Sequence, residues 1–209
     1  MNKNLPKLSN GIKVCIICEG NEEYFYLEKL NSLNVWNPKY KLILVNAEGN
    51  GNIPARYQNS FQNEDGAIIL VFCDTEKKPY EQYIDIKNKI NKFHGVENAA
   101  DQVVIYGNPC TMQIVLQHWD DIKLKTAAKK MNATYIQKFT GVSNYKGKEE
   151  QINQVMKHIT KVNYLEMSKR VQLLENDDSV VGSSNFSILI NYLSSSDDSW
   201  IDNINKIIN

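Results

Sequence analysis

Long hydrophobic runs are missing from this chain of 209 residues. No stretch reaches the roughly 18 consecutive apolar residues that a membrane-spanning helix needs. The first residues, MNKNLPKLSNGIK, contain no apolar segment of the kind that a secretory signal peptide carries. We therefore expect a cytoplasmic protein that has no membrane partner.

A net charge is lacking as well, because 24 basic residues balance 24 acidic ones. The overall charge thus gives no argument for a nucleic-acid partner. The distribution is less even, since residues 120–170 contain eleven Lys and Arg against five Asp and Glu. This local excess has two interpretations: a surface that faces phosphate groups and gains affinity from counterion release, or dispersed lysines on solvated helix faces.

Cysteine is scarce, with four residues in the chain. Cys15 and Cys18 form a C-x2-C pair, which is half of many zinc sites and also occurs in redox proteins. No second pair of this kind and no H-x3-5-H follows, and residues three apart on a strand point to opposite faces. The pattern disfavours both zinc binding and redox chemistry.

Glycine-rich phosphate-binding motifs are also missing. The turn Glu48-Gly49-Asn50-Gly51 comes nearest, and it matches neither GxGxxG nor GxxxxGK[ST]. A small anion held at this turn of a doubly wound fold is therefore a weak hypothesis.

Short apolar runs alternate with segments in which apolar residues recur every three or four positions, up to about residue 119. The runs predict strands and the periodic segments predict helices. The expected strands cover 11–18, 41–45, 67–73 and 102–106, and the expected helices cover 21–33, 53–61, 79–93 and 110–119. Such alternation is typical of an α/β fold with a mostly parallel sheet flanked by helices.

Beyond residue 119 the strand signal disappears and the sequence becomes helical and more polar. The expected helices there cover 122–131, 149–162, 164–174 and 186–193, with turn-rich segments over 175–184 and 194–199. We expect two parts, an α/β core over residues 1–119 and a helical C-terminal extension over 120–209 that packs on the core.

Two of the expected strands end in acidic residues. Glu19 follows the first strand, and Asp74 and Glu76 follow the third. In an open parallel sheet, ligands bind outside the carboxyl ends of the strands. If the chain stays extended through Thr75, the side chains of Asp74 and Glu76 point to the same side. Carboxylates of this kind suit Mg²⁺ or Mn²⁺.

The charged residues next to these acids in the sequence are not predicted to belong to the site. Glu22, Glu23, Lys77 and Lys78 look like surface residues, and a lone acid after a strand is often a helix cap or a solvated loop residue. His118 has two interpretations, a base near the site or a helix-end residue that bonds a backbone carbonyl.

The arrangement of these motifs resembles the TOPRIM superfamily, and within it the RloB-like proteins. The motifs that carry the resemblance are EGNEEYF at 19–25, DTE at 74–76, NPC at 108–110, HW at 118–119 and SNF at 184–186. The likeness is better over the first 120 residues than over the rest. It implies a TOPRIM-like α/β fold.

The resemblance also implies a function, a divalent-metal-dependent nuclease that acts in prokaryotic defence against foreign DNA or RNA. Glu19 would be a general acid/base or a metal ligand, and Asp74 and Glu76 would hold Mg²⁺ or Mn²⁺. Gly20 would let the backbone approach the phosphate, and His118 would contact the substrate. A partner ATPase that controls the nuclease is implied by the same analogy.

Two departures from the family pattern favour a different reading. Glu76 stands where an aspartate is usual, and Met112 stands where a glutamate is common. The alternative is a non-catalytic TOPRIM-like module that binds nucleic acid, a nucleotide or a partner ATPase.

Overall fold

The computed structural model describes residues 11–64 and 66–208, and its centre is a four-stranded parallel sheet. The strands lie in the order β2-β1-β3-β4. Their bounds are Ile12–Cys18 for β1, Tyr40–Asn46 for β2, Ala67–Asp74 for β3 and Val104–Gly107 for β4. The predicted α/β fold class with a parallel sheet is therefore confirmed.

The two central strands are the most apolar segments of the chain. Residues 14–18 of β1 and 70–73 of β3 are completely buried, as expected for strands that are covered on both faces. The register places Cys18 beside Phe72 of β3 and Asn46 of β2. The three strands therefore end at nearly the same level, which brings the residues that follow them to one edge of the sheet.

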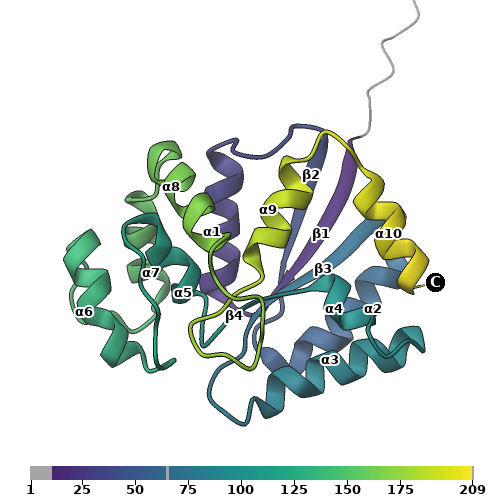
Figure 1. The fold of residues 1–209 in the computed structure, drawn as a ribbon, viewed down its shortest axis with the longest axis horizontal. Coiled ribbons are helices and arrows are strands. Elements are labelled where there is room, and N and C mark those ends of the chain that lie inside the picture. Colours follow the sequence, from purple (N-terminus) through teal and green to yellow (C-terminus); the bar gives the residue numbers. More distant parts are fainter. Residues whose placement is uncertain (1–10, 65, 209) are drawn as a thin grey trace, which may run out of the picture.

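Helices cover both faces of the sheet (Figure 1). The connection from β1 to β2 forms α1 (Asn21–Ser32) on one face. The opposite face carries α2 (Ile53–Asn63), α3 (Glu81–His94) and α4 (Ala99–Val103), with a 3-10 turn η1 (Asn50–Asn52) before α2. After β4 come the short α5 (Met112–Val115) and the 3-10 turn η2 (Leu116–His118). The helix expected over 110–119 is thus two short pieces, and α4 was not predicted.

The remaining helices are α6 (Lys129–Thr140), α7 (Glu149–Lys157), α8 (Lys161–Val171), α9 (Phe186–Ser194) and α10 (Ser199–Ile208). They contact the sheet and its helices at several places: α7 packs on α1, α9 on β4 and α10 on α4. Helix α10 was not predicted. The expected turn-rich segment 175–184 lies outside the helices, and the segment 194–199 does so except for its two end residues, which belong to α9 and α10.

The helix expected over 122–131 is wrong for most of its length, because helix α6 begins only at Lys129. The buried amides of Gln113 and Gln117 both donate to the carbonyl of Ile122, at 2.7 Å each. The Leu124 N–H donates to Gln113 Oε1 at 2.7 Å. These side chains satisfy backbone groups that a helix would otherwise pair, and they hold the segment in an irregular path.

The helix expected over 149–162 also ends early. Helix α7 stops at Lys157, and Thr160 caps the next helix by accepting a hydrogen bond from the Asn163 N–H at 3.3 Å. The Asn163 side chain accepts from the Thr160 N–H at 2.8 Å, which completes a reciprocal cap. The Thr-x-x-Asn cap starts a new helix within a stretch that the spacing of apolar residues predicts to be one helix up to residue 162.

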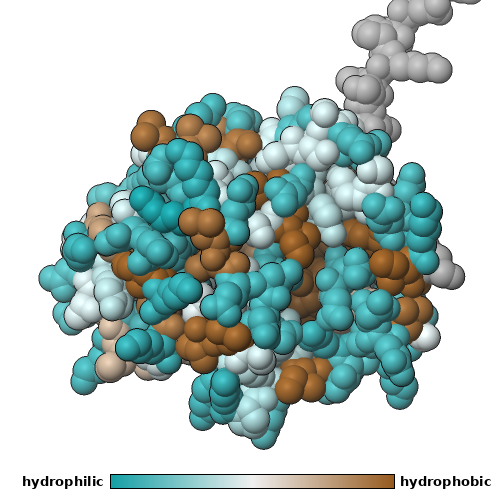
Figure 2. Space-filling view, in the orientation of Figure 1, coloured by the Kyte–Doolittle hydropathy of each residue, from teal (hydrophilic) through white to brown (hydrophobic). Residues whose placement is uncertain are grey.

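The surface is polar over most of the face in view, and hydrophobic residues form small separate patches on it (Figure 2). Scattered exposed apolar residues are normal for a folded domain. Among the described residues, no helix is both long enough and apolar enough to cross a membrane.

The outer edge of β4 is closed by the side chain of Asn185, which is 5% exposed. Its amide donates to the Val104 carbonyl at 2.8 Å, and its oxygen accepts from the Tyr106 N–H at 2.7 Å. The Ser184 hydroxyl donates to the Tyr106 carbonyl at 2.7 Å. Two side chains from the C-terminal part thus pair with the strand edge as a fifth strand would.

We predict that Asn185→Ala lowers the free energy of unfolding by roughly 2–4 kcal/mol, because it leaves one buried N–H and one buried carbonyl without partners. Urea denaturation measures this change. Asn191→Ala is the control, because Asn191 is an exposed residue of α9, the helix that Asn185 precedes. Equal small losses in both variants would contradict the role of Asn185.

Candidate functional site

The order of the strands reverses between β1 and β3, since the chain leaves β1 for β2 on one side and returns to β3 on the other. In open parallel sheets, ligands bind at such a switch point, outside the carboxyl ends of the strands. We call this place between the ends of β1 and β3 the crevice. Glu19 follows β1 and Asp74 ends β3 at this point, and the Asp74 N–H donates to Glu19 Oε2 at 2.9 Å. The structure therefore brings these two predicted site residues together.

The first turn of α1 also points into the crevice. Glu22 and Glu23 are 6% and 3% exposed, so the prediction that they lie on the surface is wrong. The reason is that only two residues separate the end of β1 from the start of α1, which leaves the first turn of α1 beside the carboxyl ends of the strands. Lys77 and Lys78 are exposed, as predicted.

Gly20 joins β1 to α1 in an extended conformation, with φ −153° and ψ −157°. A Cβ atom added there would lie 3.7 Å from Glu23 Oε2, which is an ordinary contact. The backbone turn therefore does not require glycine. The Gly20 N–H instead donates to Glu23 Oε2 at 2.9 Å and fixes that carboxylate at the start of the helix.

Glu22, Glu23 and Asp74 form a compact group of acids. One ligand atom from each lies within 4.8 Å of the others, a spacing that could hold a metal ion. Thr111 connects two of them, because its Oγ1 lies 2.6 Å from Glu23 Oε1 and 2.8 Å from Asp74 Oδ1. The Thr111 N–H also donates to Asp74 Oδ1 at 2.7 Å. A single hydroxyl proton cannot serve both carboxylates fully, so this contact favours a proton shared within the group.

Glu22 is the acid that has a cationic partner. Its Oε1 lies 2.6 Å from Lys129 Nζ and accepts from the Tyr145 hydroxyl at 3.0 Å. Among the described residues, Lys129 is the only basic side chain that forms an ion pair with one of these acids. Gly147 packs against this pair with φ +71°, and a Cβ atom there would collide with Lys129 Nζ and Glu22 Oε1.

The charges in the crevice favour protonated carboxyl groups. Burial, with the charge of Glu23 as the next cause, raises the pKa of Glu19 to about 8. Burial and the charges of Glu23 and Glu19 hold the pKa of Asp74 well above its usual range, and burial with the charge of Glu22 raises the pKa of Glu23. Burial alone lowers the pKa of Lys129, but the nearby carboxylates more than offset it. The site thus has more negative charge than its own cation compensates.

Asn50, at the start of η1, holds the carboxyl group of Glu19. One terminal atom of its amide lies 2.6 and 2.8 Å from the two carboxyl oxygens, and the other lies 2.7 Å from Gln82 Oε1. An amide nitrogen facing Glu19 donates to the ionised form, and an amide oxygen accepts from the protonated form. Asn50 was missed as a site residue, although it follows β2 at the same edge of the sheet.

Glu76 departs from the geometry expected for the Asp74-Thr75-Glu76 motif. The strand ends at Asp74, and Glu76 is exposed with φ +61°, so the extended path does not continue through it. Neither Glu76 nor Glu19 belongs to the group of three acids described above. The charge of Glu76 does contribute to the raised pKa of Glu19.

His118 lies inside the protein, with 2% of its surface exposed. Its Nε2 is 3.0 Å from the Tyr26 hydroxyl, and its Nδ1 is 3.1 Å from Asn163 Oδ1. The expected bond to a backbone carbonyl is therefore replaced by two side-chain bonds. These contacts join α1, η2 and α8, and they place His118 among packed helices and not at an open substrate surface.

No protein-family model matches the chain, and no curated protein or solved structure matches it either.

We predict that His118 makes the protein less stable in mild acid. Burial lowers the pKa of His118 from 6.5 to about 4, so between these values the unfolded chain binds a proton that the folded chain does not. Stability should fall by about 2 kcal/mol between pH 7 and pH 5 on this account. The His118→Gln variant should lose that dependence in urea denaturation.

The control for this experiment is His158→Gln, because His158 is exposed. The acids of the crevice have raised pKa values and produce the opposite slope, but they are present in every variant and cancel in the comparison. An unchanged pH dependence in His118→Gln would show that the histidine is not buried in its neutral form.

Proposed function

We propose that this protein is a divalent-metal-dependent nuclease that hydrolyses phosphodiester bonds. The observation that carries the proposal is the convergence of Glu22, Glu23 and Asp74, with ligand atoms within 4.8 Å of one another, at the switch point of a parallel sheet. Glu19 stands beside them through its bond to the Asp74 N–H.

The donor set fits Mg²⁺ or Mn²⁺, because all of its ligand atoms are carboxylate oxygens. Three carboxylates with one ammonium partner also leave negative charge that a divalent cation would balance. Glu22, Glu23 and Asp74 would hold the ion, which when bound would polarise the phosphate and favour ionisation of water.

Glu19 is the residue best suited to move a proton in this site. Its pKa of about 8 lies near neutral pH, where a general acid or base is most effective. Asn50 fixes the orientation of its carboxyl group. Glu19 would take a proton from the attacking water or give one to the leaving oxygen, and Lys129 would attract the phosphate to the crevice.

The biological setting belongs to the same proposal and rests on the resemblance to TOPRIM and RloB-like proteins. It comprises a cytoplasmic role in prokaryotic defence against foreign nucleic acid, together with a partner ATPase. The two acidic motifs behind the resemblance, at 19–25 and 74–76, supply Glu19, Glu22, Glu23 and Asp74 to the crevice.

A second candidate is a non-catalytic module that binds nucleic acid, a nucleotide or a partner protein. It is favoured by the hydrogen bonds that the acids already make, since Glu22 pairs with Lys129 and Tyr145 and Glu23 with Gly20 and Thr111. Acids with such hydrogen-bond partners can have a purely structural role.

We predict that Asp74→Asn and Glu19→Gln separate metal binding from chemistry. Asp74→Asn should weaken Mn²⁺ binding at least tenfold and abolish cleavage, because it removes a ligand charge. Glu19→Gln should keep most of the metal affinity and lose about 100-fold or more in cleavage rate, the usual contribution of a general acid or base. Calorimetric titration of Mn²⁺ and cleavage of labelled DNA and RNA strands measure the two effects.

The control is Glu28→Gln, since Glu28 is an exposed residue of α1. Should the wild-type protein bind no Mn²⁺ or Mg²⁺ and cut no substrate, the binding module is the better account. Metal-stimulated cleavage that survives Glu19→Gln would remove Glu19 from the mechanism.

We further predict that Lys129→Met tightens Mn²⁺ binding about tenfold, equivalent to about 1.4 kcal/mol. The reason is that the Lys129 ammonium lies 2.6 Å from Glu22 Oε1 and repels a second cation there. Lys130→Met is the matched control, because it removes the same charge one residue along the helix. Unchanged or weaker metal binding in Lys129→Met, in a variant with normal thermal unfolding, would exclude Glu22 as a ligand.

A further inference from the structure

A hollow beside the ion pair of Lys129 and Glu22 lies between α6 and the loop before α7. This hollow, called here the α6 hollow, has a volume of about 570 Å³ and carries the side chains of Lys129, Lys130 and Lys146. A volume of this order suits a small ligand of nucleotide size. Its other wall residues are uncharged and include Tyr145 and Asn144.

Two wall residues of the α6 hollow reach the acids directly. Lys129 Nζ and the Tyr145 hydroxyl both bond Glu22 Oε1, at 2.6 and 3.0 Å. A ligand in the α6 hollow is therefore separated from the acid group by this one layer of contacts. The backbone of Gly147 lies against the same ion pair and leaves no room for a side chain between them.

The lysines of residues 120–170 divide into two kinds. Lys123, Lys138 and Lys169 pair with surface acids, at 3.8, 3.7 and 2.9 Å, as solvated helix faces do. The others that are exposed and make no ion pair with any described residue are Lys125, Lys130, Lys146, Lys148, Lys157 and Lys161. Of these, Lys130 and Lys146 line the α6 hollow. Their charge is available to a ligand, and the two stand in one hollow although they are 16 positions apart in the sequence.

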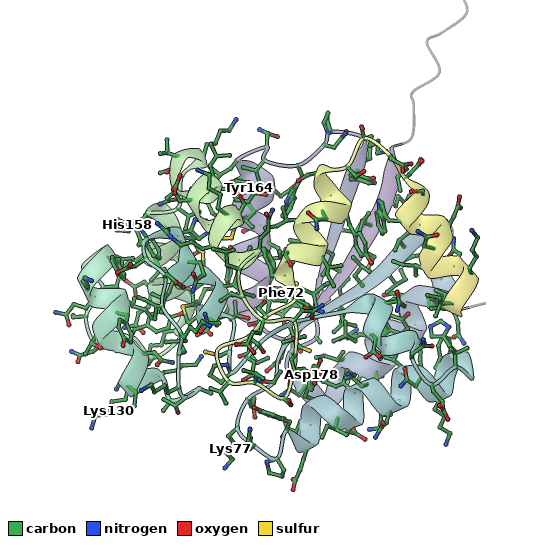
Figure 3. The ribbon with its side chains drawn as sticks, viewed as in Figure 1. Phe72, Lys77, Lys130, His158, Tyr164 and Asp178 are labelled. Atoms are coloured by element: carbon green, nitrogen blue, oxygen red, sulfur yellow. The ribbon has the colours of Figure 1, made fainter. Side chains whose placement is uncertain are left out.

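A second hollow near the acids provides a contrast. It has a volume of about 380 Å³ and contains Lys77 and Lys78, but Glu76 and Glu81 line it too, so its formal charge is balanced. Its wall includes Gln82, which lies 2.7 Å from the Asn50 amide that holds Glu19, and Glu76, whose charge helps to raise the pKa of Glu19. Figure 3 shows Lys130 at the left of the molecule and Lys77 at the bottom, so the two hollows are separate places.

We propose that the α6 hollow is the site that holds the nucleotide and phosphates of a polynucleotide strand on one side of the scissile bond. The proposal rests on the nuclease function above and adds its substrate-binding residues, Lys130 and Lys146. An anionic strand gains from unpaired lysines through counterion release. The hollow with Lys77 and Lys78 repels phosphate as much as it attracts it, so the strand is held asymmetrically, on the α6 side.

The test compares two double variants that each remove two lysines near the site, Lys130→Gln with Lys146→Gln and Lys77→Gln with Lys78→Gln. Binding of fluorescently labelled single-stranded DNA and RNA 20-mers is followed by anisotropy in EDTA, at several salt concentrations. We expect the α6 pair to weaken binding about tenfold and to lower the slope of log K against log salt by about 1.4, or 0.7 for each lysine. The Lys77 and Lys78 pair should change affinity less than threefold.

A nucleoside monophosphate should displace the strand from the wild-type protein and do so less well from the α6 variant. Equal losses in both double variants, no loss in the α6 pair, or no binding by the wild-type protein would overturn the proposal. Because the assay contains no divalent cation, its result is independent of cleavage. If the strand binds as expected but no metal-dependent cleavage is found, the proposed nuclease function is wrong and the α6 hollow is still a strand-binding site.

Discussion

In the part of the chain that the structure describes, four carboxyl groups share one crevice with a single ammonium partner, and most of the local structure follows from that constraint. Glu22 and Glu23 are buried, and Glu19 and Asp74 are half-buried. Carboxylates this close repel one another, and burial adds to the cost of ionising them. Among the described residues, Lys129 is the one lysine that pairs with these four acids. The remaining negative charge is reduced either by protons shared among the carboxyl groups or by a bound cation.

The partners of these acids come from distant parts of the chain. Thr111 precedes α5, Asn50 lies in η1, and Lys129 and Tyr145 flank the hollow between α6 and α7. Residues beyond 119 are therefore part of the site and not only a cover for the core. The closure of β4 by Ser184 and Asn185 points the same way, because the sheet edge is completed from the C-terminal part. The C-terminal part therefore contributes side chains to the edge of the sheet, to the crevice and to the α6 hollow.

Sequence periodicity predicted the sheet well because the strands of a parallel sheet are continuous apolar runs. All four strands and the helices α1, α2, α3 and α9 lie within a few residues of their expected bounds. It failed where side chains compete for backbone groups. Gln113 and Gln117 keep 122–128 out of a helix, and the Thr160 cap divides a continuous periodic stretch into two helices.

The sequence by itself determined that Glu19 and Asp74 meet, because each follows an apolar parallel strand and such strands end at one edge. Only the tertiary structure decided the rest of the site. In the sequence, Glu22 and Glu23 look like exposed residues at the start of a helix, but in the structure that helix turn lies in the crevice and both side chains are buried. The positive φ of Glu76 turns its backbone away from the direction of the strand. Lys130 and Lys146 are ordinary surface lysines in the sequence. Their common hollow depends on how the loop after α6 folds back, which local patterns of polarity do not encode.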